Sequence, residues 1–278
     1  MADYLQNERL SPLMSVMQHA ARKASRSLLR DFGEVEHLQV SRKGPADFVS
    51  SADKKAEEAI IENLRRDRPG YSFLAEEAGE IIGSDKTHRF IIDPLDGTTN
   101  YLHGIPHFAI SIALEREIDG NPKELVAGLV YNPINDEMFF AEKGKGAYIN
   151  DGTRGGGDRR LRPARRDIFA DSLFATGIPF LGRPGHAKFL KELHQVMGAS
   201  SGVRRLGSAA LDLAWTAAGR YDGFWERGLA VWDIAAGVLI CQEAGLSVES
   251  LSCGDVLETG DVIIASEVLM PQLKERVG

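Results

Sequence analysis

Hydrophobic residues recur at helical spacing in two segments near the start of the chain. Ser11-Pro12 precedes apolar residues three and four positions apart, from Leu13 to Leu28, and proline suits the first turn of a helix. A second segment, from Ser51 to Arg66, carries its apolar residues on one face and is followed by a Pro-Gly pair. The pattern predicts two amphipathic helices, with Gly33 as the stop of the first.

Beyond Tyr71 the spacing changes to that of strands. The apolar runs are YSFLAEE, RFIID, AISIALE, LVAGLVYN, EMFFAEK and GAYIN, and several of them alternate with polar residues. Residues 132–136 and 142–146 have the composition of hairpin turns. We therefore expect an antiparallel sheet with one face covered in this half of the chain.

Strand-like and helix-like runs alternate in the second half. FADSLFAT, YDGFWE and DVIIAS predict strands, and AKFLKELHQVMG, SAALDLAWTAAG and DIAAGVLICQEAG predict helices, with one more helix at the end. This alternation indicates an α/β arrangement. We expect a single domain, residues 1–278, with two lobes at about 1–152 and 167–278.

The two lobes are joined by a glycine- and arginine-rich stretch, residues 153–167, with almost nothing apolar. Such a composition is typical of an exposed connection, and a binding patch for RNA or a partner protein is the alternative.

Composition limits the functional classes. The hydrophobic content of 43% and charged content of 26% are typical of a globular protein in water. No basic leader precedes an apolar run, and no apolar stretch approaches the roughly 18 residues of a membrane span. Two cysteines give neither a disulfide framework nor zinc spacing. We expect a cytoplasmic protein without a membrane partner.

The formal charge of −7 argues against a general nucleic-acid binder. It also means that an anionic substrate would need local cations, either side chains or bound metal ions.

Acidic residues recur where the predicted elements begin and end. In FIIDPLDGTTN, Pro94 interrupts regular strand pairing, and Asp93 and Asp96 can converge across a turn. Two converging carboxylates repel unless a cation or a proton lies between them. The following Gly97-Thr98-Thr99 offers peptide N–H groups for a phosphate. Hard oxygen ligands beside a phosphate site suit Mg²⁺, and a solvated turn is the alternative.

Other acids occupy comparable positions. Glu76 ends a strand, Asp233 precedes an apolar helix, and Asp47 and Asp53 flank the start of the second helix. Each has an ordinary structural explanation, as a surface residue or a helix cap. Motifs for a nucleophilic serine, a Walker loop, a zinc protease or a dinucleotide fold are absent from the sequence.

Taken together, these segments resemble the inositol monophosphatase family of Mg²⁺-dependent phosphatases, which is related in fold to fructose-1,6-bisphosphatase. The family signature DP[IL]DGT[TL]N matches residues 93–100, and WDxAAG matches residues 232–237. Residues 47–53, 75–77 and 144–147 agree as well, so the resemblance covers nearly the whole chain. It implies an α/β (α+β) fold, a layered α/β/α/β/α sandwich, and a homodimer.

The resemblance also implies a set of metal ligands. Glu76, Asp93 and the backbone carbonyl of Leu95 would hold one Mg²⁺. Asp93, Asp96 and Asp233 would hold a second, and a third, weaker ion would lie near Glu76, with Mn²⁺ as a possible substitute. Inhibition by Li⁺ follows, because the family's second metal site accepts that ion.

Catalytic and substrate-binding roles are carried over in the same way. The catalytic residues would be Glu76, Asp53 and Thr98, of which Thr98 and Asp53 orient and help to deprotonate the attacking water. The N–H groups of Gly97 and Thr98, beside Thr99, would hold phosphate oxygens. Lys43 matches the lysine of bacterial members, with Arg42 as the alternative in another loop register.

The substrate hydroxyl groups would be bound on the other side of the site. Glu226 matches the family glutamate that contacts inositol hydroxyls, and Asp96, Ala209 and Asp233 would add contacts beside a wall that begins at Gly207. Arg227 is either exposed, paired with Glu226, or directed to a second anionic group.

The expected reaction is direct in-line hydrolysis of myo-inositol 1-phosphate by a metal-activated water. The alternatives are a fructose-1,6-bisphosphatase, a histidinol-phosphatase, a phosphoadenosine-phosphate nucleotidase, or a relative with an added non-catalytic role in RNA synthesis or ribosome assembly. A bisphosphate enzyme should carry extra cations near its pocket, and beyond Lys43 and Arg227 the sequence indicates none.

Overall fold

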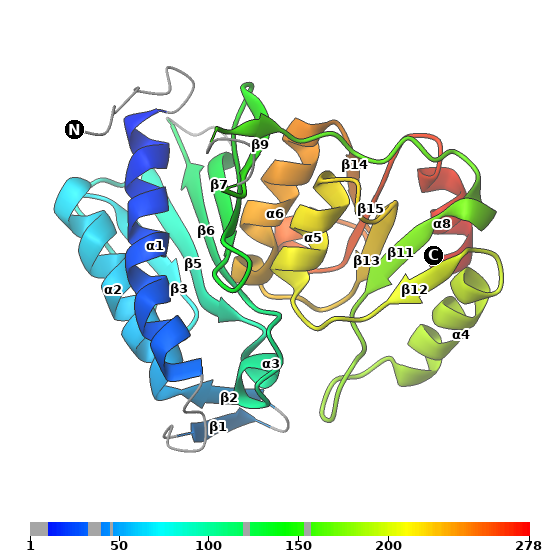
Figure 1. Ribbon diagram of the computed structural model, residues 1–278, viewed down its shortest axis with the longest axis horizontal. Helices are drawn as coiled ribbons and strands as arrows, with labels where there is room; N and C mark the ends of the chain where they lie inside the picture. Colours follow the sequence, from blue (N-terminus) through cyan, green and yellow to red (C-terminus); the bar gives the residue numbers. More distant parts are fainter. Residues whose placement is uncertain (1–10, 33–39, 45–46, 119–122, 153–156) are drawn as a thin grey trace.

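The protein folds into five layers of alternating helices and sheets (Figure 1). The computed structural model describes residues 11–32, 40–44, 47–118, 123–152 and 157–278, and only the backbone of residues 40–44 and 47–50. Helices α1 and α2 cover one face of a first sheet, α5 and α6 lie between the two sheets, and α4 and α8 cover the outer face of the second. The expected layered α/β/α/β/α sandwich is confirmed.

The helices and strands have the following bounds. The helices are α1 (Pro12–Phe32), α2 (Ser51–Asp67), α3 (Thr98–Leu102), α4 (His186–Met197), α5 (Ala209–Ala217), α6 (Val231–Ala244), α7 (Val256–Thr259) and α8 (Met270–Val277), with a 3-10 helix at Phe169–Asp171. The strands are β1 (Val40–Gly44), β2 (Asp47–Ser50), β3 (Ser72–Ala75), β4 (Gly79–Ile81), β5 (His88–Asp96), β6 (Ala109–Arg116), β7 (Glu124–Asn132), β8 (Glu137–Glu142), β9 (Gly146–Asn150), β10 (Arg159–Arg160), β11 (Leu173–Thr176), β12 (Gly202–Arg204), β13 (Gly223–Glu226), β14 (Ser247–Ser250) and β15 (Val262–Ala265).

The first sheet has the order β10-β9-β8-β7-β6-β5-β3-β4 and is antiparallel except at one position. Strands β3 and β5 run parallel, with Ala75 opposite Ile92. The prediction of an antiparallel sheet missed this pair, because β4 is inserted between the two strands in sequence. Parallel strands end at the same edge of a sheet, so the residues after Ala75 and Ile92 emerge side by side.

The second sheet has the order β12-β11-β13-β15-β14. Strands β11, β12 and β13 are parallel to one another, whereas β13, β15 and β14 are antiparallel. The predicted α/β second half is therefore confirmed in outline, although its sheet is mixed.

The central helices pack closely enough to need glycine. A Cβ atom built on Gly128 of β7 would lie 2.8 Å from the Ala236 carbonyl oxygen, and one on Gly237 would lie 2.6 Å from Leu213 Cβ. These contacts explain the small residues of the WDxAAG segment, because α6 is enclosed by the first sheet and by α5. The core around them is shared by both sheets, and the proposed division into two lobes remains a prediction.

Several local predictions need correction. Strand β5 continues past Pro94 to Asp96, and its register shifts between Asp93 and Asp96. The run predicted as a strand from Phe169 begins as a 3-10 helix. Strands β1, β2, β4, β10, β12 and β14 were not predicted, because each is short and lacks clear alternation. Gly33, the predicted stop of the first helix, lies outside the described residues.

The arginine-rich connection is not simply an exposed loop. Strand β10 extends the sheet beyond β9, Leu161 is buried, and Arg166 forms an ion pair with Asp222 at 2.9 Å. In the part of the chain that the structure covers, no helix is long and apolar enough to cross a membrane.

Candidate active site

One cavity of about 660 Å³ contains most of the residues singled out in the sequence. The predicted residues that line it are Glu76, Asp93, Leu95, Asp96, Gly97, Thr98, Thr99, Gly207, Ala209, Glu226 and Asp233. They come from the ends of β3, β5 and β13 and from the starts of α3, α5 and α6. The fold thus brings together segments that are up to 157 positions apart in the sequence (from Glu76 to Asp233).

Glu76 and Asp93 are neighbours because β3 and β5 are parallel. Ala75 is paired with Ile92, and the Glu76 N–H donates to the Ile92 carbonyl at 3.1 Å. The next residue on each strand is therefore an acid at the same sheet edge. Asp93 is only 2% exposed, and one of its oxygens accepts a hydrogen bond from the Leu95 N–H at 2.9 Å. Burial, followed by the charges of Glu76, Asp96 and Asp233, raises the pKa of Asp93 well above its ordinary value.

Asp96 is held at the start of α5. Its Oδ2 accepts hydrogen bonds from the Ser208 hydroxyl at 2.5 Å and from the Ala210 N–H at 2.8 Å. These bonds join β5 of the first sheet to the helix that covers the second. Burial raises the pKa of Asp96 to about 6, although the bonds from Ser208 and Ala210 oppose the rise.

Asp233 lies in the first turn of α6, two residues inside the helix. Its Oδ2 accepts a hydrogen bond from the Ala230 N–H at 2.8 Å, so it caps the helix from inside rather than from the predicted N-cap position, which Ala230 occupies. The Ser111 hydroxyl donates to the Trp232 carbonyl at 3.1 Å, and Ser111 is paired with Asp93 across β5 and β6. These contacts hold the start of α6 beside the strand end. Burial, then Asp96, raises the pKa of Asp233 well above its ordinary value.

Thr98 connects the cavity to a buried acid behind it. Its hydroxyl lies 3.1 Å from Asp53 Oδ1 and 3.1 Å from the Leu95 carbonyl oxygen. Asp53 does not line the cavity and is 0% exposed, in the first turn of α2. Gly97, just before α3, has a φ of 98°, and a Cβ there would lie 3.1 Å from the His107 carbonyl oxygen. The turn after Asp96 therefore requires glycine.

The donor set fits a hard divalent cation. Asp93, Asp96 and Asp233 each use one oxygen for a hydrogen bond within the protein, and their mutual repulsion favours a positive charge between them. Among the described residues, no three His, Cys, Asp or Glu side chains already enclose a point that would hold an ion.

Glu226 lies at the end of β13, across the cavity from the strand ends of the first sheet. A Cβ atom built on Gly177 would come within 1.8 Å of Glu226 Oε1, so the carboxylate rests directly against the Gly177 backbone. Burial, followed by Asp96, raises the pKa of Glu226 to about 8, while Arg205 and Arg183 oppose this rise. Gly207 and Ala209 line the same cavity as Glu226 and Asp96.

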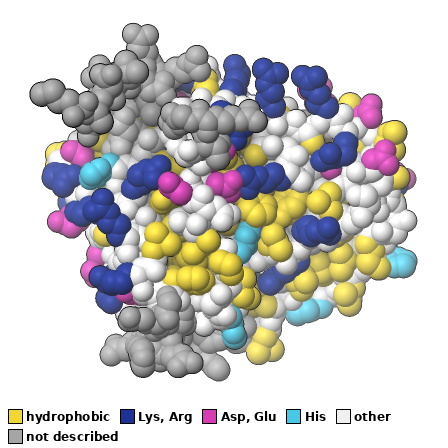
Figure 2. All heavy atoms as spheres, viewed as in Figure 1, with side chains coloured by type: hydrophobic (Ala, Val, Ile, Leu, Met, Phe, Trp, Pro, Cys, Tyr) yellow, Lys and Arg dark blue, Asp and Glu magenta, His cyan; other side chains and the backbone are white. Residues whose placement is uncertain are grey.

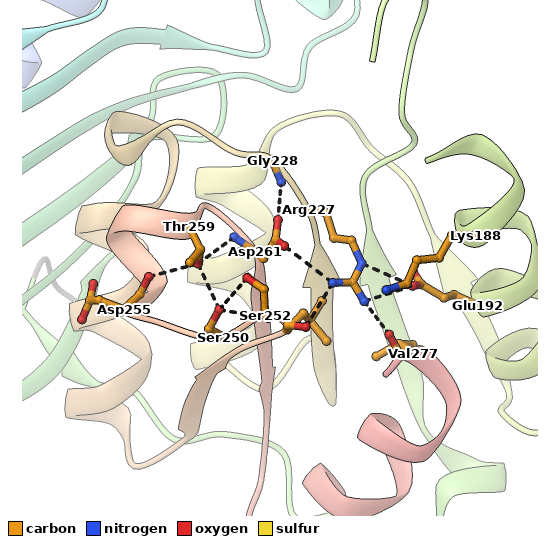
Figure 3. Close-up of polar contacts among 11 residues, drawn as sticks. Lys188, Glu192, Arg227, Gly228, Ser250, Ser252, Asp255, Thr259, Asp261 and Val277 are labelled. Carbon is orange, nitrogen blue, oxygen red and sulfur yellow. Dashed lines mark hydrogen bonds and ion pairs between the residues drawn. The ribbon is translucent and has the colours of Figure 1, made fainter. Parts of the chain in front are cut away.

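Arg227 is half-buried, and its ion-pair partners are Glu192 and Asp261 rather than Glu226. Figure 3 shows its guanidinium between Asp261 and Glu192, with ion-pair distances of 3.7 and 3.1 Å. It also donates to the Val277 carbonyl at 2.7 Å, which ties the end of α8 to the strand that carries Glu226. Its side chain is 24% exposed. The three alternatives given for Arg227 from the sequence did not include ion pairs with Glu192 and Asp261.

Sequence reasoning missed four other residues of the cavity. Arg183, Lys188 and Arg205 are exposed cations that line it, and Asp212 is a buried acid of α5. The cavity therefore carries cations that the sequence did not indicate beyond Lys43 and Arg227. Arginines on loops are common surface residues, so no pattern marked them. For Asp212, an acid within the apolar run SAALDLAW was an available signal.

Lys43 lies on β1, and Asp47 begins β2, which pairs with it. Their side chains, and that of Arg42, lie outside what the structure describes. Lys43 therefore remains the predicted match to the lysine of bacterial members, with Arg42 as the alternative.

Comparison with known proteins agrees with this geometry. The model of the inositol monophosphatase family matches residues 9–277. The inositol-1-monophosphatase of Caulobacter vibrioides is 54% identical over 263 residues, which cover 94% of this chain and 99% of that protein. The Nus factor SuhB of Escherichia coli K12 is 38% identical, over 91% of each chain.

A solved structure agrees as well. The extragenic suppressor protein suhB of Bartonella henselae superposes with a TM-score of 0.89 at 53% identity, over 96% of this chain and 98% of that one. The chain therefore belongs to the inositol monophosphatase family and is a phosphoric monoester hydrolase.

Proposed function

We propose that this protein hydrolyses myo-inositol monophosphates, with inositol 1-phosphate as the main substrate, in a Mg²⁺-dependent reaction. The observation that carries the proposal is the gathering of Glu76, Asp93, Asp96 and Asp233 in one cavity that Glu226 also lines. The name of the Caulobacter relative supports the same substrate.

The carboxylates would hold two to three Mg²⁺ ions, with Mn²⁺ as a substitute. Glu76, Asp93 and the Leu95 carbonyl would form one site, and Asp93, Asp96 and Asp233 a second. A weaker third ion would lie near Glu76. When bound, the ions would neutralise the phosphate and acidify a water molecule.

Thr98 and Asp53 would orient that water and accept its proton. A hydroxyl group has one proton to donate, and Asp53 Oδ1 is within 3.1 Å of it. With its proton directed to Asp53, Thr98 Oγ1 can accept a hydrogen bond from the attacking water. The Gly97 and Thr98 N–H groups, at the start of α3, would hold the phosphate oxygens, with Thr99 beside them.

The organic part of the substrate would lie toward Glu226. A carboxylate at this wall accepts hydrogen bonds from ring hydroxyl groups, with Asp96, Asp233 and the Gly207–Ala209 wall completing the contacts. Arg183, Lys188 and Arg205 would attract the anionic substrate to a protein that is itself negatively charged.

A bisphosphate is the alternative substrate, because these same cations could bind a second phosphate group. Arg227 cannot serve a second phosphate without leaving Glu192 and Asp261, whereas Arg183 and Arg205 are exposed at the cavity. A panel of inositol 1-phosphate, fructose 1,6-bisphosphate, histidinol phosphate and phosphoadenosine phosphate at fixed Mg²⁺ tests the assignment. We expect the highest kcat/KM for inositol 1-phosphate, and a higher value for any other substrate would contradict it.

Replacing Gly177 by alanine should weaken substrate binding. The new methyl group would force the Glu226 carboxylate away, since the two would otherwise approach to 1.8 Å. We expect the KM for inositol 1-phosphate to rise about tenfold, the cost of roughly 1.4 kcal/mol of lost hydrogen bonding. Gly157→Ala is the control, because a Cβ at Gly157 meets nothing within 4 Å. An unchanged KM in Gly177→Ala would remove Glu226 from the substrate site.

Lithium should inhibit the enzyme, because the second site of the family accepts Li⁺ in place of Mg²⁺. Steady-state rates with increasing Li⁺ at fixed Mg²⁺ should fall in a saturable manner. Full activity at high Li⁺ concentration would contradict the proposed second site.

We also propose a cytoplasmic homodimer. Both cysteines, Cys241 and Cys253, are free, as suits a reducing compartment. Hydrophobic side chains gather at the lower right of Figure 2, over α4 and the segment before it, and Phe180, Leu181 and Leu190 are among the exposed ones. Light scattering should give twice the mass of the 30.4 kDa chain.

A separate role in RNA synthesis is the second candidate, because one relative is named a Nus factor. The exposed arginines of the connection, such as Arg162 and Arg165, would be its surface. A cellular phenotype that Asp93→Asn rescues would show that such a role does not depend on hydrolysis.

A further inference from the structure

Helix α2 carries two buried acids one turn apart. Asp53 is 0% exposed and Glu57 is 3% exposed, and both lie on the side of the helix that faces the sheet edge. Like charges at this spacing destabilise a helix by themselves, and a buried carboxylate needs hydrogen-bond donors. Each of the two is satisfied by a segment of the candidate active site: Asp53 by Thr98, as described above, and Glu57 by the turn between β3 and β4.

Glu57 binds this turn with both carboxylate oxygens. Oε2 accepts a hydrogen bond from the Glu77 N–H at 2.8 Å, and Oε1 accepts one from the Ala78 N–H at 2.9 Å. These two peptide groups follow directly after Glu76. Glu76 is held on its other side by the bond from its N–H to the Ile92 carbonyl oxygen. The backbone of Glu76 is thus fixed between the sheet and the Glu57 carboxylate.

The outer side of this turn borders an open groove. A groove of about 660 Å³ lies there, lined by Glu57, Glu77 and Ala78 together with charged residues of α2. Ala78 is exposed. Two charge-assisted hydrogen bonds to one carboxylate therefore hold two consecutive peptide groups of a turn that borders this groove.

We propose that Glu57 is a positioning residue for Glu76 and thereby sets the affinity of the site for its divalent cation. Glu57 does not line the cavity, so it would touch neither the substrate nor the cation. It acts by holding the peptide groups after Glu76, so that the Glu76 carboxylate stands beside Asp93. The inference rests on the proposed function, since it assumes that Glu76 is a ligand. Residues that orient metal ligands typically change metal affinity by about 10- to 100-fold.

The test is a calorimetric titration of metal-free protein with Mg²⁺. In Glu57→Gln, one oxygen still accepts an N–H, whereas the new NH₂ group faces the other N–H. We expect Mg²⁺ to bind at least about tenfold more weakly than in the wild type, with kcat at saturating Mg²⁺ nearly unchanged. Glu58→Gln is the matched control, because Glu58 is the exposed next residue of the helix. Mg²⁺ affinity equal to that of the wild type in a folded Glu57→Gln protein would overturn the proposal.

Hydrogen exchange of the wild-type protein gives a second, independent test if the variant does not fold. Coupling between ligand and positioning residue is reciprocal, so Mg²⁺ binding should slow exchange of the Glu77 and Ala78 amides. Equal exchange with and without Mg²⁺ would overturn the positioning role while leaving the metal site intact. A wild type that binds no Mg²⁺ in calorimetry would instead overturn the proposed function and this inference with it.

Discussion

Replacing Asp93 by asparagine should reduce kcat/KM for inositol 1-phosphate by about a thousandfold or more and should make the metal-free protein more stable. The loss of activity follows because Asp93 is the one side chain assigned to both metal sites. Losing the stabilisation of several kcal/mol that metal ions give to a phosphoryl-transfer transition state corresponds to a factor of this size.

The gain in stability follows from the raised pKa of Asp93. Burial and the charges of Glu76, Asp96 and Asp233 raise that pKa above its ordinary value. Between the ordinary and the raised pKa, the folded protein binds more protons than the unfolded chain, so stability falls as the pH rises through this interval. At neutral pH an uncharged asparagine avoids this loss. Activity and stability should therefore change in opposite directions, as at many functional sites.

Both effects can be measured on the same samples. Chelator-treated Asp93→Asn should melt at a higher temperature than chelator-treated wild type at neutral pH, and Mg²⁺ should raise its melting temperature less. Asp171→Asn, a change at an exposed aspartate, should leave both quantities unchanged. Retention of wild-type activity, or a lower melting temperature without metal, would contradict the electrostatic description of the site.

The second large effect is expected for Asn100→Asp. Asn100 is 6% exposed, and its amide nitrogen donates to the carbonyl oxygens of His107 and Leu206, both at 2.8 Å. These bonds hold the turn proposed to bind phosphate against the segment that leads to α5. A carboxylate cannot donate to them and would repel both carbonyl groups. We expect a loss of about 2–4 kcal/mol in the free energy of unfolding, because two buried acceptors lose their donor.

Denaturant unfolding checks this value, and substrate kinetics check its consequence. Separation of Gly97 from the Gly207–Ala209 wall should also raise the KM for inositol 1-phosphate. Asn135→Asp makes the same chemical change at an exposed hairpin turn and should alter the free energy of unfolding by less than about 0.5 kcal/mol. If the two variants had the same free energy of unfolding, the hydrogen bonds of Asn100 to His107 and Leu206 would contribute nothing measurable to stability.

The parts of the site that the sequence predicted were those with a local signal. Asp93, Asp96 and Gly97 follow one another at the end of one apolar run. Proline and glycine in the same segment predict a turn there without knowledge of the fold. Asp233 is next to a helix start, which limits where its carboxylate can point. The two signatures then placed all of these residues in one family arrangement, and the layered fold followed from it.

The remainder depends on long-range pairing. Glu76 adjoins Asp93 because β3 and β5 are parallel, although the surrounding run of strands suggested only antiparallel neighbours. Glu57 is an acid within a helix, where acids are common, and its role is visible only from the two peptide groups it binds. Arg227 lies beside Glu226 in sequence, yet its partners are residues of α4 and of the segment before β15. Which residues such a side chain contacts depends on the direction in which it points. The spacing of residues in the sequence does not determine that direction.

The central claim, hydrolysis of a phosphate monoester that depends on a cation held by these carboxylates, is tested most directly by metal titration of the purified enzyme. Inositol 1-phosphate hydrolysis should be undetectable in metal-stripped wild-type protein and should return in a saturable manner as Mg²⁺ is added. Asp93→Asn should show no comparable return at any Mg²⁺ concentration. Undiminished turnover by the stripped wild-type enzyme, or full recovery of Asp93→Asn by Mg²⁺, would contradict the account.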